Sequence, residues 1–431
     1  MDCKKITKFP LIIWMLIPLY SQDSFEEFLK QQQRAQQESF DIEENELKNY
    51  ITAVTSQYEK YEREQQQEFE DFKKAVEQKW QNFKSPKSKE YVEYDDDLDS
   101  RATIDFEKGE VTVEIILEEE LPSETEQASK LPEKNTKKSN SLKNKLKTSD
   151  IPPKETKRLT DEKAISKRKD VSKKKIKKKL SDIIKSKGFD GKPLLNRQLA
   201  DKKGKTVTPK TADKYAASLV SNTPIKTKSY KAKDGKKRTV YTVKVPMKSD
   251  HINTRADRYK KEVLKQSKRF NIDPIIAFAV METESAFNPK AKSHIPAYGL
   301  MQLVPKSGAR DAYLYVYKKD KFVDGRYLYQ PEKNIELGCA YLSKIRHTYF
   351  KSIKDNEKAY LCAIPAYNTG IGNVAKALTG NTKLKAASKK ANSMSPSQLY
   401  NKLHKDLKYK EARDYLERVW TRKDKYSEMI H

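Results

Sequence analysis

Charge is segregated along this chain, and the segregation argues against a single hydrophobic core. Residues 22–121 contain 28 acidic and 13 basic side chains, whereas residues 130–187 contain 22 basic and 7 acidic ones. Of all 431 residues, 36% are hydrophobic and 35% are charged. Segments this polar bury too little apolar surface to offset the entropy that is lost on ordering. We therefore expect a multidomain protein whose folded parts are separated by a solvated, Lys-rich stretch.

The formal net charge of +28 allows two interpretations of that stretch. One is attraction to a polyanion, such as nucleic acid, anionic lipid or an acidic wall polymer. The other is a self-repelling linker that stays in water. The run of lysines at 173–179 contains no aromatic residue on which a base could stack, which favours the linker.

The N-terminus has the pattern of a secretory signal. Three lysines within residues 4–8 precede an apolar run at 9–20, and polar sequence follows Ser21. We predict that residues 1–21 are a signal peptide; an uncleaved segment would be a short membrane anchor. Either way the protein is expected to be exported, to the periplasm and with envelope or membrane association as an option.

Two cysteines follow the predicted signal. In an oxidising compartment, Cys339 and Cys362 could form a disulfide. Both lie in apolar helical patterns, so two buried thiols fit equally well.

The remaining chain divides by its periodicity. Residues 22–121 are expected to form the first part of an N-terminal α+β domain, with a long helix and a hairpin whose turn contains Gly109. Residues 122–189 are expected to be a Lys-rich linker or disordered insert, and residues 190–250 the second part of the domain. Residues 251–431 are helical by pattern, with loops expected at 285–310, 318–331 and 368–398.

One segment of the helical part predicts a specific chemistry. Asp273 can cap a helix that begins at Pro274, and residues 275–281 are apolar throughout, so the helix is expected to be buried. Glu282 and Glu284 lie about 200° apart on it and cannot share a face.

Glu284 falls on the buried side, at the C-terminal turn. Desolvation and the negative end of the helix dipole both disfavour its ionised form, so its pKa should rise. A carboxylic acid that is protonated near neutral pH can serve as a general acid for cleaving a glycosidic bond. The plainer alternative is a glutamate at a helix end that points into water.

Four further motifs follow in order. They are 284–289 (ESAFNP), 298–305 (YGLMQLVP), the core-helix pattern at 334–342, and 366–370 (AYNTG), with Tyr415 near the end. This ordered set resembles the soluble-lytic-transglycosylase family over roughly residues 255–425. The segments 80–116 and 394–419 are similar to the membrane-bound transglycosylase C branch of the lytic murein transglycosylases. No Cys follows the apolar N-terminal run, so lipid attachment there is not expected.

The resemblance implies a mostly α, lysozyme-like domain that cleaves the glycan strands of peptidoglycan between N-acetylmuramic acid and N-acetylglucosamine. By the family's motif, Glu284 protonates the leaving oxygen and then accepts the proton of the muramic 6-hydroxyl, which closes a 1,6-anhydro ring. No cofactor is implied. The residues implied to contact substrate are Ser285, Gln302, Tyr367, Asn368 and Tyr415.

Other functions remain open on the sequence. A muramidase-type hydrolase is the alternative enzyme, and a non-catalytic wall-binding module is the alternative from another class. Nucleic-acid binding is not expected of an exported protein. The five histidines are scattered without the spacing of a metal site, so no metal is expected.

Overall fold

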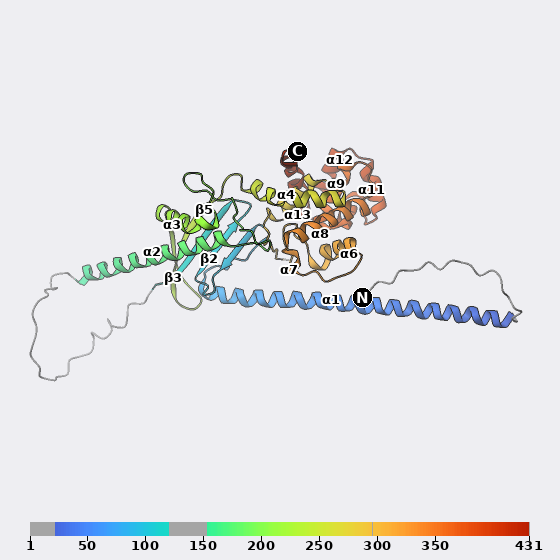
Figure 1. The fold of residues 1–431 in the computed structure, drawn as a ribbon, viewed down its shortest axis with the longest axis horizontal. Coiled ribbons are helices and arrows are strands. Elements are labelled where there is room, and N and C mark those ends of the chain that lie inside the picture. The colour runs from blue at the N-terminus through green and yellow to red at the C-terminus, as the bar shows by residue number, and fades with distance from the viewer. Residues whose placement is uncertain (1–21, 120–152, 295, 431) are drawn as a thin grey trace, which may run out of the picture. The chain divides into compact units, whose positions relative to one another are not determined.

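The computed structural model describes residues 22–119, 153–294 and 296–430 (Figure 1). The predicted signal peptide, 1–21, lies outside the described residues. The chain divides into two compact units, residues 1–62 and residues 63–431. The helix α1 (Gln22–Lys79) belongs to both.

A five-stranded antiparallel sheet forms the core of the N-terminal region. Its order is β1-β2-β3-β5-β4, and the bounds are β1 (Glu90–Tyr94), β2 (Ser100–Asp105), β3 (Glu110–Glu118), β4 (Lys226–Lys231) and β5 (Lys237–Pro246). Strand β3 pairs with β5 from Glu110–Pro246 to Glu118–Arg238. The two parts of the α+β region therefore share one sheet across the insert, as the sequence predicted.

The β2–β3 turn confirms the role expected of Gly109. Its φ is +71°, and a Cβ there would lie 2.6 Å from the His251 ring. Glycine is required here for both reasons, because a side chain would be strained and would also collide.

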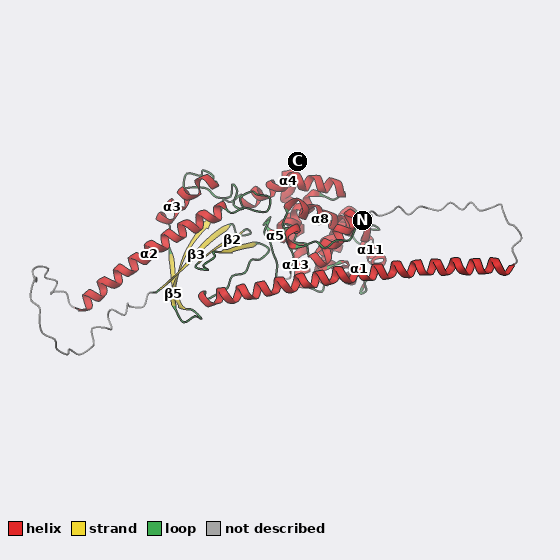
Figure 2. Cartoon of the chain, turned by 60° about the horizontal axis from the view of Figure 1, so that its bottom comes forward, coloured by secondary structure: helices red, strands yellow, loops and turns green. Residues whose placement is uncertain are grey.

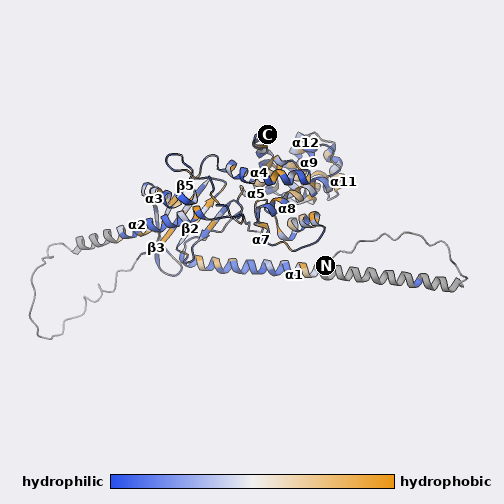
Figure 3. Cartoon of the chain, in the orientation of Figure 1, coloured by the Kyte–Doolittle hydropathy of each residue, from blue (hydrophilic) through white to orange (hydrophobic). Residues whose placement is uncertain are grey.

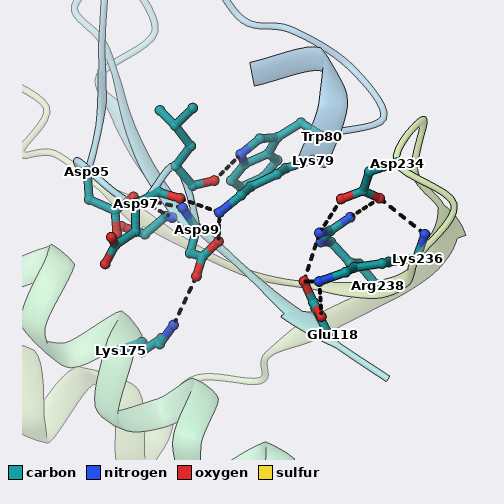
Figure 4. A network of polar contacts seen from close by, with 12 residues as sticks. Lys79, Trp80, Asp95, Asp97, Asp99, Glu118, Lys175, Asp234, Lys236 and Arg238 are labelled. Carbon is teal, nitrogen blue, oxygen red and sulfur yellow. Dashed lines mark hydrogen bonds and ion pairs between the residues drawn. The ribbon is translucent and has the colours of Figure 1, made fainter. Parts of the chain in front are cut away.

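Figure 4 shows how the end of α1 is fastened to the sheet region. Lys79 Nζ donates to Asp97 O at 2.6 Å and to Asp99 Oδ1 at 3.0 Å. Trp80 is 2% exposed and its indole N–H donates to Leu98 O at 2.7 Å. A second group in the same view joins Arg238 to Asp234 and to Glu118. These contacts satisfy polar groups that packing of Trp80 would otherwise leave unpaired.

Helix α2 (Pro153–Lys185) shows that the linker prediction for 122–189 is wrong over 153–185, whereas residues 122–152 lie outside the described residues. Ile176, Leu180, Ile183 and Ile184 are buried in one hydrophobic cluster with the strands β2, β3 and β5. Their spacing of three and four places them on one face of the helix. The lysines occupy the other faces, which is why composition concealed an amphipathic helix. Figure 2 shows α2 running along the sheet.

The helix α3 (Ala212–Asn222) packs on α2 and buries Ala212, Ala216 and Val220 in the same cluster. The 3-10 turn η3 (Pro209–Thr211) precedes it. The sequence does not predict strand β4, because its residues, KTKSYK, are exposed except for Tyr230 and show no alternation of apolar and polar residues. It is an edge strand, and lysines on an edge discourage pairing with another chain.

The C-terminal region is helical, and the fold class predicted from the sequence is confirmed there. Its first five helices are α4 (His251–Phe270), α5 (Pro274–Ser285), α6 (Arg310–Tyr317), α7 (Gly325–Leu328) and α8 (Pro331–Lys344). They are followed by α9 (Asn356–Thr369), α10 (Ile371–Thr379), α11 (Leu384–Asn392), α12 (Pro396–Asp406), α13 (Lys410–Arg422) and α14 (Asp424–Ile430). Two π-helical turns, Pro305–Ala309 and Ile345–Tyr349, adjoin α6 and α8.

The loop predicted at 368–398 is wrong, because α10 and α11 lie within it, and α7 interrupts the loop predicted at 318–331. Short helices such as these are stabilised by packing rather than by propensity. Hydropathy follows the fold: Figure 3 shows apolar residues on the strands and the C-terminal helices, and mostly hydrophilic residues on the coloured part of α1. Within the described residues, no helix has the length and apolar character needed to cross a bilayer.

The packing of α2 on the sheet gives a first prediction. Leu180→Ala should lower the free energy of unfolding by about 2–5 kcal/mol, because it leaves a cavity at a fully buried position. Denaturation in urea measures the change. The matched control is the exposed neighbour Lys178→Ala, expected to change stability by less than about 0.5 kcal/mol. Equal effects of the two variants would mean that α2 does not dock on the sheet.

Candidate active site

Local sequence signals fix the helix that carries the predicted acid. Asp273 caps α5, with its carboxylate accepting from Ile275 N at 2.8 Å, and Pro274 occupies the first turn. The next residues, from Ile276 to Thr283, are all buried. A helix that is apolar on every side must lie inside the protein, and α5 does.

Glu284 stands in the last turn of α5 and is partly exposed. The Tyr415 hydroxyl, from α13, donates to its Oε1 at 2.8 Å. Burial raises the pKa of Glu284 from 4.5 to about 7, against the opposing effect of the Tyr415 hydrogen bond. The nearby Glu411 carboxylate raises this pKa further, while Lys89 and Arg418 lower it. A carboxyl whose pKa lies near 7 can both release and accept a proton at neutral pH.

The second glutamate of the helix, Glu282, is bound by other side chains. Glu282 is 4% exposed, and its carboxylate accepts from the Tyr426 hydroxyl and pairs with Lys425. The guanidinium Nε of Arg422 lies 3.5 Å from its other oxygen. The two carboxyls thus face different neighbours, in agreement with their predicted separation around the helix.

The chain leaves α5 through two left-handed residues. Ala286 has φ 48° and Phe287 has φ 59°, a region that residues with a Cβ seldom adopt. Asn288 follows, is fully buried, and donates from its side chain to Ser88 O at 3.1 Å. Such a turn persists when surrounding contacts hold it, and those contacts come from both the sheet region and α4.

Arg255 of α4 is the centre of those contacts. Its Nε donates to Ala286 O at 2.9 Å, its Nη1 to Gln198 Oε1 at 2.5 Å, and its Nη2 to Phe106 O of the β2–β3 turn. Nη1 also lies 3.1 Å from His251 Nδ1. Burial and the guanidinium lower the pKa of His251 to about 4, so the imidazole is neutral and can accept this hydrogen bond.

Burial also lowers the pKa of Arg255 itself, to about 9. The guanidinium therefore stays charged at neutral pH, although none of its hydrogen bonds goes to a carboxylate. Two backbone carbonyl oxygens and one side-chain amide oxygen accept its hydrogen bonds instead. A buried charge without a counter-ion needs such acceptors in good geometry, because the local dielectric constant is low.

The motif at 298–303 forms a tight loop beside α5. Gly299 has φ +74°, and a Cβ there would lie 2.3 Å from Leu328 O and 2.4 Å from Asn334 Nδ2. Asn334 is fully buried in α8, donates to Tyr298 O and Leu328 O at 2.8 Å each, and accepts from Met301 N at 2.7 Å. The close approach permitted by Gly299 is thus made to Asn334, which shapes the loop.

Hydrogen bonds tie this loop to the helices around Glu284. Ser285 Oγ donates to Leu300 O at 2.7 Å and also lies 3.1 Å from Met281 O. Tyr367 of α9 donates to Met301 O at 2.9 Å. Burial, with the charge of Glu284 as a smaller cause, raises the pKa of Tyr367 well above its usual value of 10.

The structure places the six residues predicted for the site in different surroundings. Glu284, Tyr367 and Tyr415 are brought together, with both phenols acting electrostatically on the carboxyl or bonded to it. Ser285 is fully buried with its hydroxyl on backbone carbonyls, and Asn368 is exposed at the end of α9. Gln302, at φ 46°, donates to Gly299 O at 3.0 Å while its Oε1 is buried without a partner.

Sequence reasoning missed Arg255 and Asn334. Each was detectable as a polar residue on an otherwise apolar helical stripe: Arg255 lies four residues before Tyr259, and Asn334 lies four before Gly338. A polar side chain at such a position needs buried partners, but the sequence does not say which.

The structure also decides between the two alternatives for the cysteines. Cys339 and Cys362 are free thiols, both fully buried, and burial raises the pKa of each to about 12. They are inert at neutral pH rather than paired. Among the described residues no cluster of His, Cys, Asp and Glu has the arrangement of a metal site.

Comparison with known families bears on both regions. Residues 262–390 match the family model described as "Transglycosylase SLT domain". The chain carries an SLT domain. Residues 48–129 and 180–258 match "Membrane-bound lytic murein transglycosylase C, N-terminal domain". The resemblance read from the motifs is thereby confirmed, and the SLT domain contains Glu284, Gln302 and Tyr367.

Curated relatives agree with both matches. Proteins named membrane-bound lytic murein transglycosylase C are 36% identical over 238 residues in Glaesserella parasuis serovar 5 and 34% identical over 236 residues in Haemophilus ducreyi. Each alignment covers 54% of this chain and 62% of the relative. The chain therefore spans less than two thirds of the length of these relatives.

Solved lytic transglycosylases are more distant. The Slt enzyme of Pseudomonas aeruginosa is 24% identical with a TM-score of 0.30, covering 40% of this chain and 24% of that one. The 70 kDa soluble enzyme of Escherichia coli is 16% identical with a TM-score of 0.31, covering 64% and 44%. TM-scores of 0.30 and 0.31 do not indicate that the whole chain is arranged as in these enzymes.

The hydrogen bond from Tyr415 gives a prediction for the SLT domain. Tyr415→Phe removes a donor that stabilises the carboxylate, so the pKa of Glu284 should rise above about 7. If protonated Glu284 is the active form, activity falls as pH rises through this pKa, and the variant's alkaline limb moves to higher pH. A pH–rate profile measures this. Tyr409→Phe, at an exposed position outside the site, is the control. A shift to lower pH would contradict the assignment.

The contacts of Arg255 give a further testable prediction. Arg255→Met leaves Phe106 O and Ala286 O without their donor, and we expect unfolding to become easier by about 2–4 kcal/mol. Loss of the bond to Ala286 should also let Glu284 drift, so that kcat falls about tenfold or more with little change in KM.

Thermal unfolding and steady-state kinetics at a temperature where the variant is folded separate the two effects. The exposed Arg326→Met is the control and should resemble the parent protein in both. A stable variant with unchanged kcat would rule out a positioning role for Arg255.

Proposed function

We propose that this chain is a peptidoglycan lytic transglycosylase that cleaves the β-1,4 bond between N-acetylmuramic acid and N-acetylglucosamine. The observation that carries the proposal is the carboxyl of Glu284 at the end of the buried helix α5, whose Oε1 accepts from the Tyr415 hydroxyl at 2.8 Å within the matched SLT domain. The names of the curated relatives supply the substrate class.

The reaction needs one group that acts twice. Glu284 gives its proton to the glycosidic oxygen as the bond from that oxygen to the muramic C1 breaks. The resulting carboxylate then takes the proton of the muramic 6-hydroxyl, whose oxygen bonds to C1 and closes the 1,6-anhydro ring. No water is consumed, and the enzyme ends in its starting protonation state. A pKa of about 7 favours both halves, because neither protonation state is scarce at neutral pH.

Other side chains have roles that follow from their positions. The Tyr415 hydroxyl would hold Glu284 in one orientation and stabilise its carboxylate form. The unpartnered Oε1 of Gln302 is suited to accept an N–H or O–H of a bound sugar, because a buried oxygen gains most from a new donor. Ser285 would act through the backbone it holds, and Tyr367 through the loop carbonyl to which it donates. Asn368, which is exposed, remains a candidate for sugar contact.

Hydrolysis is the alternative reaction, and one residue makes it testable. A hydrolase of the ordinary kind needs a second carboxyl to activate water or form a covalent intermediate. Glu411 is an exposed carboxylate of α13 whose charge acts on Glu284. The proposal treats it as an electrostatic neighbour, so Glu411→Gln should retain activity.

The proposed setting is the cell envelope. Peptidoglycan strands are the proposed partner, with export through the N-terminal segment and envelope association in keeping with the relatives' name. Neither nucleic acid nor a cofactor has a part in the proposal. A wall-binding module without catalysis is the remaining alternative, and it predicts that Glu284 can be replaced without consequence.

Product analysis tests the proposal. Incubation with purified peptidoglycan should release 1,6-anhydromuropeptides, and Glu284→Gln should reduce the rate at least a thousandfold, since it removes the only proton that the scheme uses. Mass spectrometry distinguishes the anhydro product from a reducing end by the mass of one water. Glu282→Gln is an unsuitable control because it is buried, so exposed Glu417→Gln is used. Reducing ends would indicate a hydrolase, and full activity of Glu284→Gln would favour the binding module.

A further inference from the structure

A hollow lies between three helices of the C-terminal region, α9, α12 and α13, which pack on one another (Figure 1). Its volume is about 310 Å³. Ligand pockets in proteins have volumes of about 300–1,000 Å³, so the hollow is large enough for one small ligand unit. Two aromatic rings line it, Tyr400 of α12 and Trp420 of α13, and both residues are partly exposed. Aromatic rings that keep one side in water are typical of binding sites.

The hollow is separate from the candidate active site, although the same helices contribute to both. Trp420 follows Tyr415, the residue that binds Glu284, by five positions, which is about 140° around α13. Glu357, which also lines the hollow, precedes Tyr367 by ten positions, or about 15 Å along the axis of α9. None of the residues predicted for the catalytic site lines the hollow.

The lining of the hollow is almost free of charge. Of all residues in the chain, 35% are charged, yet Glu357 is the one charged residue in this lining. The other lining residues are aliphatic, aromatic or neutral polar ones, namely Leu361, Pro396, Ser397, Tyr400, Asn401 and Trp420. Such a surface fits a neutral ligand that has both apolar faces and groups for hydrogen bonding.

The neutral polar groups of the hollow are available to a ligand. Asn401 is exposed, and its side-chain amide has no hydrogen-bond partner among the described residues. The indole N–H of Trp420 likewise has no partner within the described part of the chain. An amide can donate and accept at once, whereas an indole N–H only donates. Together they can bind neighbouring hydroxyl or acetamido groups of one ligand.

Other contacts hold the two rings and leave no place for a cationic ligand. The Tyr400 ring stacks on His404, with centroids 5.8 Å apart and an interplanar angle of 13°. The Lys423 ammonium lies 4.8 Å from the centroid of the Trp420 ring. Because this cation already lies over the indole, an ammonium group of a ligand would meet like charge there. A neutral ligand would meet rings whose orientation needs little reordering.

We propose that this hollow is a second carbohydrate-binding site, which takes a neutral N-acetylated hexosamine of a glycan strand while another part of the strand lies at Glu284. The C–H face of such a sugar is apolar and packs against an aromatic ring, here Trp420 or Tyr400. Its hydroxyl and acetamido groups match the amide of Asn401 and the carboxylate of Glu357. Binding at two places on one long strand increases its retention without any new contact at the catalytic centre. The identity of the strand as peptidoglycan rests on the proposed function, whereas the binding of the sugar does not.

Tryptophan fluorescence tests the site directly. The chain has three tryptophans, of which Trp14 lies in the predicted signal peptide and Trp80 is buried. Trp420 is therefore the partly exposed tryptophan of the described residues. Chitotetraose, a neutral oligomer of N-acetylglucosamine, should change the emission of the full chain saturably, and Trp420→Phe should abolish the change. Asn401→Ala keeps the fluorophore and should weaken binding about threefold to tenfold, because it removes a hydrogen bond.

A matched control and two substrates separate binding from damage to the fold. Tyr409→Ala replaces an exposed tyrosine that does not line the hollow, and this variant should bind chitotetraose like the parent protein. Asn401→Ala should slow product release from insoluble peptidoglycan, about threefold or more. Its cleavage of a soluble tetrasaccharide from peptidoglycan should be unchanged, because the few sugars of that substrate are taken up around Glu284.

The inference would be overturned if chitotetraose caused no saturable change in emission. A saturable change caused by a lysine-containing peptide, and not by the sugar, would also overturn it and would indicate an ammonium site. Sugar binding in a protein that releases no product from peptidoglycan would count against the proposed function while leaving the second site intact. Product release without sugar-dependent emission would count against the second site alone.

Discussion

A single guanidinium, buried without a carboxylate, holds the functional part of this protein together. Arg255 contacts the sheet turn at Phe106, the segment after α2 at Gln198, and the residue that ends α5 at Ala286. Each of these partners is an uncharged oxygen: two are backbone carbonyls, and one is the side-chain amide oxygen of Gln198. The left-handed turn after Glu284 is thereby fixed from behind, and a strained conformation becomes a stable one. The sheet region and the helical region are consequently joined here, as they also are where Asn288 donates to Ser88 O and where Arg422 donates to Glu107.

The environment of Glu284 is a balance between opposing effects rather than simple burial. Desolvation raises its pKa, while one hydrogen bond and two cations lower it, and the result is about 7. Because these contributions come from α5, α13 and the segment before β1, three separate pieces of chain determine one acidity. The loop at 298–303 adds shape rather than charge, and Asn334 holds it by three hydrogen bonds.

Local signals were read reliably from the sequence, and long-range ones were not. The cap at Asp273, the turn at Gly109 and the burial of α5 depend on neighbours in the chain, and all three were predicted correctly. The composition of 153–185 predicts a linker, because its lysines outnumber four well-spaced apolar residues, yet those four residues dock helix α2 on the sheet. The meeting of Lys89 with Glu107 and Arg422 could not be foreseen, because it depends on a registration between domains that no periodicity encodes.

The pairing of β3 with β5 has a consequence for biogenesis. When Glu118 leaves the ribosome, β3 has one neighbour, and its other edge stays open until the chain has been made as far as Pro246. Pairing so distant in sequence is slow, and an open apolar edge invites aggregation in the meantime. The intervening Lys-rich sequence carries an excess of positive charge, so copies of the nascent chain repel one another during that delay.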